Sequence, residues 1–200
     1  MKFKIHLKFA ITWFLFLLFN MISFSLASEE SYSLIKDLSK TGKHNTFISI
    51  LENNPLFLPL INNTVKSTIY APTDKAFDIL PESFKKEINT NNIKYTTKII
   101  LSHIFGGNNL ELNADADMVL SLDGSLYYNY EVGDLFVKDI VLRGNPFQSN
   151  NFTVIPVGCV MFLQQSSKDI RLDKEIQSKF KYTTCCLQTQ QEYSELIKDL

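Results

Sequence analysis

The spacing of apolar residues changes near Gly106-Gly107, and this change constrains the fold more than any other feature of the chain. Before it, apolar residues recur three and four positions apart, which predicts amphipathic helices, the clearest from about Ile93 to Phe105. After it, apolar and polar residues alternate, which predicts strands at 118–122, 126–132, 135–142 and 152–163. Helices followed by a meander predict an α+β fold, with N-terminal helices packed on a small β-sheet wedge or sandwich.

The first 27 residues have the three parts of a secretory signal peptide. Three lysines precede an apolar segment, and Ser25 and Ala27 place small residues before a cleavage site. The alternative is an uncleaved membrane anchor, because residues 9–27 are barely long enough to span a bilayer. We expect a secreted, periplasmic or cell-surface protein that begins at Ser28. It would contact a membrane only if the segment stays uncleaved.

The charge composition argues against nucleic acid as a partner. The chain has 20 basic and 21 acidic residues, so it shows no excess of positive charge for binding nucleic acid. Only two of the basic residues are arginines, which makes bidentate arginine clamps on phosphate scarce.

One ten-residue motif reads Thr-Ile-Tyr-Ala-Pro-Thr-Asp-Lys-Ala-Phe, from Thr68 to Phe77. It resembles the first signature of fasciclin-type (FAS1) domains. We expect structural roles for its residues: Ala71 permits a close approach, Pro72 ends a strand, Thr73 caps the next helix and Phe77 anchors that helix in the core. The motif shows no arrangement for acid, base or nucleophile chemistry, and we expect it to order a strand-to-helix turn.

The resemblance covers about residues 31–163 and includes His103 at the end of the long helix. Several family positions differ: Ser102 replaces a tyrosine. In the second signature Asn151 and Phe152 take the Asn-Gly places, and Ile155 and Gly158 replace the histidine and aspartate. The resemblance implies a compact sandwich of helices against a small wedge of β-sheets. It also implies a secreted or surface-bound module of the kind used in cell adhesion.

Residues 164–200 lie outside the resemblance and are expected to form a tail that is dispensable for folding. Apolar residues at 193, 196, 197 and 200 predict a short amphipathic helix at its end. Such a helix would either pack back on the domain or bind a partner.

Residues with catalytic or metal-binding chemistry do not converge in the sequence. His44 and His103 have no metal-ligand spacing, and no nucleophile-elbow motif occurs. The triplet Asn113, Asp115 and Asp117 imitates the start of a calcium loop, but the required glycine and glutamate are missing. We therefore expect no catalytic residues, no cofactor and no metal.

Five residues are open to covalent modification. Cys159 falls on a core strand, where we expect a buried free thiol, and adjacent Cys185 and Cys186 would be strained if paired. An odd number of cysteines leaves at least one without a partner in the chain, and linkage between chains through the tail is the alternative. Asn62 and Asn151 lie in N-glycosylation sequons that matter only in a eukaryotic secretory route.

Asp139-Ile140 stands where an Asp-Ile pair in animal family members is associated with integrin binding. The alternative is an ordinary strand end with Ile140 buried and Asp139 solvated. From the resemblance we expect an exported, non-enzymatic module that mediates adhesion or protein contact. The alternative is a module that binds a small lipid or glycan in a groove between helices and sheet.

Overall fold

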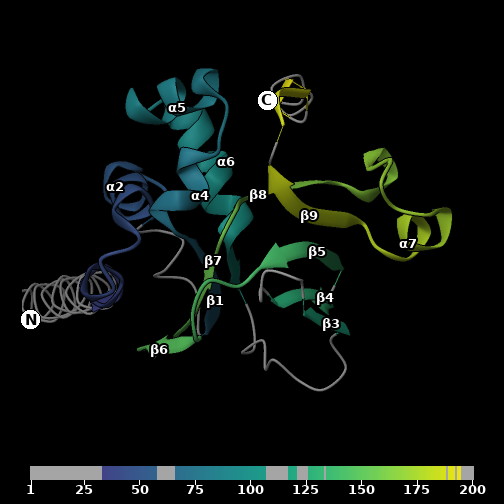
Figure 1. The fold of residues 1–200 in the computed structure, drawn as a ribbon, viewed down its shortest axis with the longest axis horizontal. Coiled ribbons are helices and arrows are strands. Elements are labelled where there is room, and N and C mark those ends of the chain that lie inside the picture. Colours follow the sequence, from purple (N-terminus) through teal and green to yellow (C-terminus); the bar gives the residue numbers. More distant parts are fainter. Residues whose placement is uncertain are drawn as a thin grey trace, which may run out of the picture.

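The structure is a computed structural model that describes residues 33–57, 66–106, 117–120, 126–132, 134–187, 189–191 and 193–194. Its elements form a layer of helices, a four-stranded sheet and a five-stranded sheet (Figure 1). The α+β fold class is therefore confirmed.

Most helices precede the second sheet in the chain. Residues 33–40 are helical and are followed by α2 (Asn45–Asn53), α4 (Asp74–Asp78), α5 (Glu82–Asn89) and α6 (Ile93–His103). A 3-10 turn, η1 (Ser166–Lys168), and helix α7 (Lys174–Lys179) come late. The side chains of Asn92 and Asp173 cap α6 and α7 by accepting hydrogen bonds from backbone N–H groups of the first turn.

The first sheet has the order β2 (Ile104–Gly106), β1 (Ser67–Pro72), β7 (Phe152–Val157) and β6 (Phe147–Ser149). Its two central strands, β1 and β7, run parallel, and the outer pairs are antiparallel. The second sheet has the order β3 (Asp117–Leu120), β4 (Leu126–Val132), β5 (Leu135–Val141), β9 (Tyr182–Leu187) and β8 (Val160–Gln165). In this sheet only β5 and β9 pair in parallel among the described strands.

Strands β1 and β7 are buried along their whole length because both of their faces are covered. On one face, Ile69 and Val154 belong to the apolar core shared with the helices. On the other face, Tyr70 and Ile155 pack with residues of β5, β8 and β9. The first sheet therefore packs against the helices with one face and against the second sheet with the other.

The long helix ends earlier than the sequence predicts. Helix α6 stops at His103, and Ile104 and Phe105 instead belong to β2, paired with Ile69 and Thr68 of β1. The spacing of four residues that suggested a helix is compatible with a strand this short. The open edge of β1 supplies hydrogen-bond partners that decide in favour of the strand.

The expected strand from Phe152 to Leu163 is two strands in different sheets. β7 and β8 are separated by Gly158 and Cys159, where the chain passes from the first sheet to the second. Two further strands, β6 and β9, were not expected from the sequence, and neither was α7.

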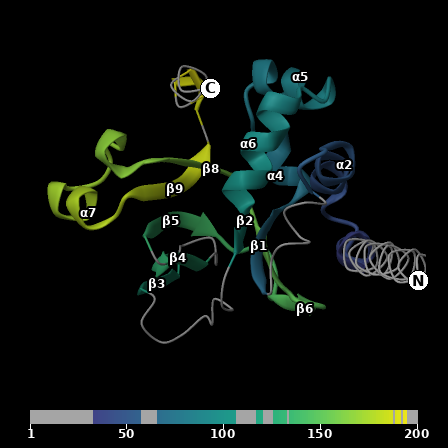
Figure 2. The same cartoon turned by 180° about the vertical axis from the view of Figure 1, so that it is seen from behind.

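Residues after Leu163 do not form a separate tail, which corrects the expected domain boundary. β9 lies between β5 and β8, and α7 lies at the end of the molecule opposite to α2 (Figures 1 and 2). Further on, Tyr193 is buried with its ring 5.0 Å from that of Phe84. The expected helix after it extends into residues 195–200, which lie outside the described residues.

None of the described helices is long and apolar enough to cross a membrane. The expected signal peptide, residues 1–27, falls outside the described part of the chain.

Candidate functional site

The signature turn joins β1 to α4. β1 ends at Pro72, Ala71 is fully buried and Phe77 is 5% exposed, as its anchoring role requires. Thr73 occupies the N-cap position of α4, but its side chain makes no capping hydrogen bond. Its backbone N–H instead donates to the carbonyl of Val157 over 3.0 Å. The expected cap by the Thr73 hydroxyl is therefore wrong, because the backbone of this residue ties the turn to β7.

Asp74 connects this turn to α2. Its carboxylate accepts hydrogen bonds from the Thr46 backbone N–H over 2.8 Å and from the Asn45 amide over 2.9 Å. Burial opposes ionisation of Asp74, but these hydrogen bonds outweigh it and lower the pKa of the carboxyl. Asp74 thus caps α2 from another element, and α2 has no side-chain cap of its own.

His44 fixes the other side of the same turn. The Nδ1 atom of His44 lies 2.9 Å from the Pro72 carbonyl oxygen, so it donates a hydrogen bond there. Burial lowers the pKa of His44 in spite of this bond. At pH 7 the His44 side chain is therefore neutral, and its hydrogen bond links the start of α2 to the end of β1.

A groove of about 680 Å³ lies at the carboxyl ends of β1 and β7. Because these strands are parallel and Pro72 pairs with Val157, the residues that follow them, Thr73 and Gly158, meet at one edge of the sheet. Loops before α2 and after β5 complete the groove. Its lining residues are Gly42, Lys43, Thr73, Asp74, Lys75, Ile79, Arg143 and Gly158.

Backbone hydrogen bonds hold the walls of the groove. The Asp74 N–H donates to the Lys43 carbonyl over 2.7 Å, and the Arg143 N–H donates to the Pro156 carbonyl over 2.9 Å. The Gly158 N–H donates to the Val141 carbonyl over 2.8 Å. The lining segments, which are distant in sequence, are therefore fixed relative to one another.

Glycine at position 158 makes room for an arginine. A Cβ atom there would lie 2.6 Å from Nε and 2.8 Å from Cγ of Arg143. The Arg143 side chain therefore lies directly over Gly158 at the groove wall.

The groove has an excess of positive charge. Lys43, Lys75 and Arg143 line it with a single carboxylate, that of Asp74, which already accepts two hydrogen bonds from α2. Lys43 and Lys75 are exposed, and within the described part of the chain neither forms a salt bridge. Ile79 adds an apolar side chain that is 57% exposed.

His103 and Ser102 have a structural role at the end of α6. The Nδ1 of His103 lies 2.7 Å from the Ile99 carbonyl, and its Nε2 accepts the Met161 N–H over 3.0 Å. The Ser102 hydroxyl oxygen accepts the Leu163 N–H over 2.9 Å. These two side chains cover alternate N–H groups on the outer edge of β8. Burial lowers the pKa of His103 to about 4, so its ring is neutral at pH 7.

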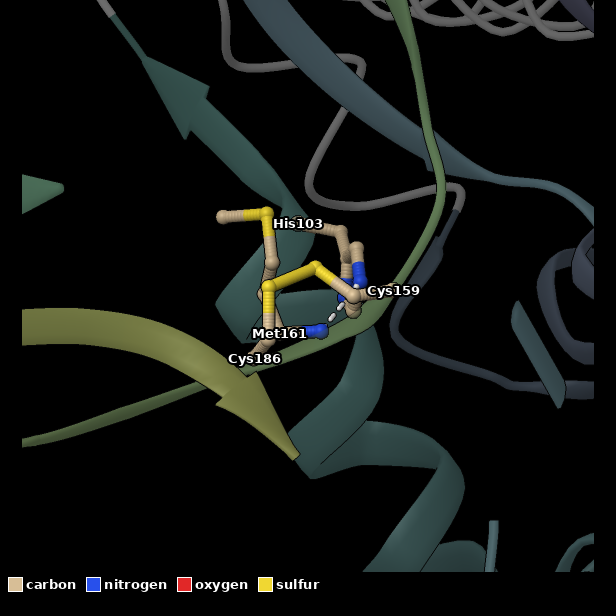
Figure 3. Close-up of a disulfide and its surroundings, with 4 residues drawn as sticks. All are labelled: His103, Cys159, Met161 and Cys186. Atoms are coloured by element: carbon tan, nitrogen blue, oxygen red, sulfur yellow. Dashed lines mark hydrogen bonds between the residues drawn. A yellow bond between two sulfur atoms is a disulfide. The ribbon is translucent and has the colours of Figure 1, made fainter. Parts of the chain in front are cut away.

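A disulfide links Cys159 to Cys186 beside His103 (Figure 3). Their Cα atoms lie 5.4 Å apart, and both side chains are almost completely buried. The expected free thiol at Cys159 is therefore wrong. The bond joins the turn after β7 to β9, and it leaves Cys185 without another cysteine in the chain.

The structure describes the side chain of only one of the two residues expected to contact a partner, Asp139 and Ile140. Ile140 is 1% exposed and packs between the sheets, so it is not presented to a partner. The Asp139 side chain lies outside the described residues. Ile140 thus matches the alternative of an ordinary strand end.

The remaining candidate metal-binding and glycosylation residues form no site in the described part of the chain. No group of three or more metal-ligating side chains occurs among the described residues. Asn113, Asp115 and Asn62 lie outside them, and Asn151 is half-buried in the turn before β7. No sequence pattern singles out Lys43, Lys75 or Arg143, and only the scarcity of arginine draws attention to one of them.

Comparison with known proteins identifies the fold family. The model of the Fasciclin domain matches residues 42–161, which is 120 of the 200 residues. No curated protein matches the chain. Among solved structures, a FAS1 domain pair from the insect cell adhesion molecule Fasciclin I is similar, with 20% identity and a TM-score of 0.38. That match covers 58% of this chain and 43% of the other.

The arrangement of helices and sheets and the family match define the same class of protein. It is an α+β domain of the kind found in extracellular and cell-surface proteins. The chain belongs to the fasciclin (FAS1) domain family.

Proposed function

We propose that this protein is an exported, non-enzymatic fasciclin module that mediates adhesion or another protein contact. The observation that carries the proposal is the Fasciclin domain match over residues 42–161. The described side chains also favour contact over catalysis. The buried histidines hold backbone groups, and the groove residues offer charge without a paired nucleophile and base.

Export is part of the proposal and rests on the N-terminal sequence. We expect cleavage after Ala27, so that the mature protein begins at Ser28. Mass spectrometry of the exported protein tests this expectation. A protein that retained Met1 would contradict cleavage and support the membrane anchor.

The alternative small-ligand function requires a pocket of suitable chemistry. A lipid site is normally deep and mostly apolar. The groove at the signature turn is instead open, and five of its eight lining residues are polar or charged. This favours contact with a charged surface over burial of a lipid.

An adhesion assay tests the proposed function. Beads coated with the mature protein should adhere to the surface of the producing cells, and excess soluble protein should compete. Beads coated with the reduced, unfolded protein serve as the control. Adhesion no greater than that of the control would contradict the proposal.

A further inference from the structure

The groove at the signature turn has features of a preformed binding site. Its walls are held by backbone hydrogen bonds from Asp74, Arg143 and Gly158, so little ordering is needed before a ligand binds. Its volume of about 680 Å³ is that of an ordinary ligand site.

The charge of the groove is local and not a property of the whole surface. The complete chain carries 20 basic and 21 acidic residues, whereas the groove has three cations and one carboxylate. That carboxylate, Asp74, is engaged in capping α2. Lys43 and Lys75, which form no salt bridge in the described part of the chain, therefore favour an anionic ligand.

Ile79 distinguishes among anionic ligands. It lines the groove and is 57% exposed, so burial of its side chain is available to a partner. A sulfated glycan has charge but no apolar side chain to cover Ile79. A peptide can present carboxylates and an aliphatic side chain together. Lysine ammonium groups suit such carboxylates because they bind as point charges without a fixed geometry.

We propose that the groove between the signature turn and Arg143 binds an acidic peptide segment of a partner protein. Carboxylates of the segment would bind Lys43 and Lys75, and a neighbouring apolar side chain would pack on Ile79. The inference rests on the proposed contact function and gives that contact a place and a chemistry.

Fluorescence anisotropy with a labelled peptide of sequence Glu-Glu-Leu-Glu-Glu-Leu tests this site on the mature protein. The peptide should bind saturably, and binding should weaken as salt rises. The matched peptide Gln-Gln-Leu-Gln-Gln-Leu should bind at least tenfold more weakly. Absence of saturable binding by the acidic peptide would overturn the proposal. A heparin hexasaccharide that bound while the peptide did not would also overturn it, in favour of a glycan.

Charge-reversal variants locate the binding. Lys43→Glu with Lys75→Glu should weaken peptide binding by roughly tenfold or more, because both ammonium groups contact the peptide. Lys94→Glu with Lys174→Glu changes the net charge equally at exposed sites outside the groove, and should change binding less than about twofold. Equal losses in the two variants would overturn the site. The milder pair Lys43→Gln with Lys75→Gln provides the same comparison if charge reversal impairs folding.

The adhesion assay separates this inference from the proposed function. If unmodified protein supports adhesion but does not bind the acidic peptide, the groove proposal fails and the contact function stands. If unmodified protein does not support adhesion, the contact function fails whatever the peptide result.

Discussion

At the scale of residues, several buried or half-buried polar side chains hold backbone groups that the sheets and helices leave open. His103 and Ser102 accept N–H groups of β8, His44 donates to the Pro72 carbonyl, and Asp74 caps α2. Removing any of these groups leaves a buried backbone donor or acceptor without its partner, which is costly. The polar residues near the family motif therefore stabilise the fold.

We expect stability to fall in mild acid because of His103. Its pKa is about 4 in the folded protein and 6.5 in the reference state, so between these values the unfolded chain binds a proton that the folded chain does not. The free energy of unfolding should therefore be highest above pH 6.5 and fall toward pH 4, by up to about 3 kcal/mol. His44 contributes in the same direction.

Urea unfolding at pH 7.5, 6.0, 5.0 and 4.5 measures this dependence. His103→Gln should be less stable at pH 7.5 and should show a smaller change in stability across this range. An unchanged pH dependence in the variant would show that His103 is not the group responsible.

Phe77→Ala should lower the free energy of unfolding by about 3–5 kcal/mol, because it removes an aromatic ring buried between α4 and the core. Asp78→Ala, an exposed neighbour on the same helix, should change it by less than about 0.5 kcal/mol. Thermal and urea unfolding of the two variants provide the comparison. Equal melting of Phe77→Ala and the parent would contradict the placement of this helix.

At the scale of elements, the sequence predicts those that depend on local signals. The end of β1 at Pro72, the burial of Phe77 and the hairpin strands β4 and β5 follow from proline chemistry and apolar spacing. Strands β2 and β9 could not be predicted because each is defined by the neighbour with which it pairs. Local sequence also does not show that the Thr73 backbone N–H bonds to Val157 while the Thr73 hydroxyl makes no capping hydrogen bond.

The cysteine pairing is another property of tertiary structure. Met161 lies opposite Cys186 in the β8–β9 pair, and the turn before β8 places Cys159 within bonding distance of Cys186. Sequence spacing alone does not contain that register. The same holds for the groove, whose cations come from α4 and from the loops before α2 and after β5.

Loss of the disulfide should destabilise the protein. It closes a loop of 27 residues, for which chain entropy gives roughly 3–4 kcal/mol. Cys186→Ala should therefore melt well below the parent, and a reducing agent should not lower its melting temperature further. Cys185→Ala is the adjacent control and should keep its sensitivity to the reducing agent. The account of this bond would be contradicted if Cys185→Ala, and not Cys186→Ala, abolished that sensitivity.

At the scale of the whole molecule, the central claim is that the fasciclin fold continues through β9 as one folding unit. The family match ends at residue 161, yet β9 joins β5 to β8, and Phe180 and Thr184 are buried. Without β9, β5 and β8 would lose their common neighbour, and the second sheet would be divided. We therefore expect residues 164–187 to be required for folding, in contrast to the expectation from the sequence.

Thermal unfolding of two truncated chains under reducing conditions tests this claim most directly. The reducing conditions remove the disulfide from the comparison. A chain ending at Leu187 keeps β9 and should melt cooperatively, at a lower temperature than the parent because it lacks Tyr193. A chain ending at Ser166 lacks β9 and should show no cooperative transition. If the chain ending at Ser166 melted cooperatively at the temperature of the parent, the claim would be contradicted and the fold would be complete without β9.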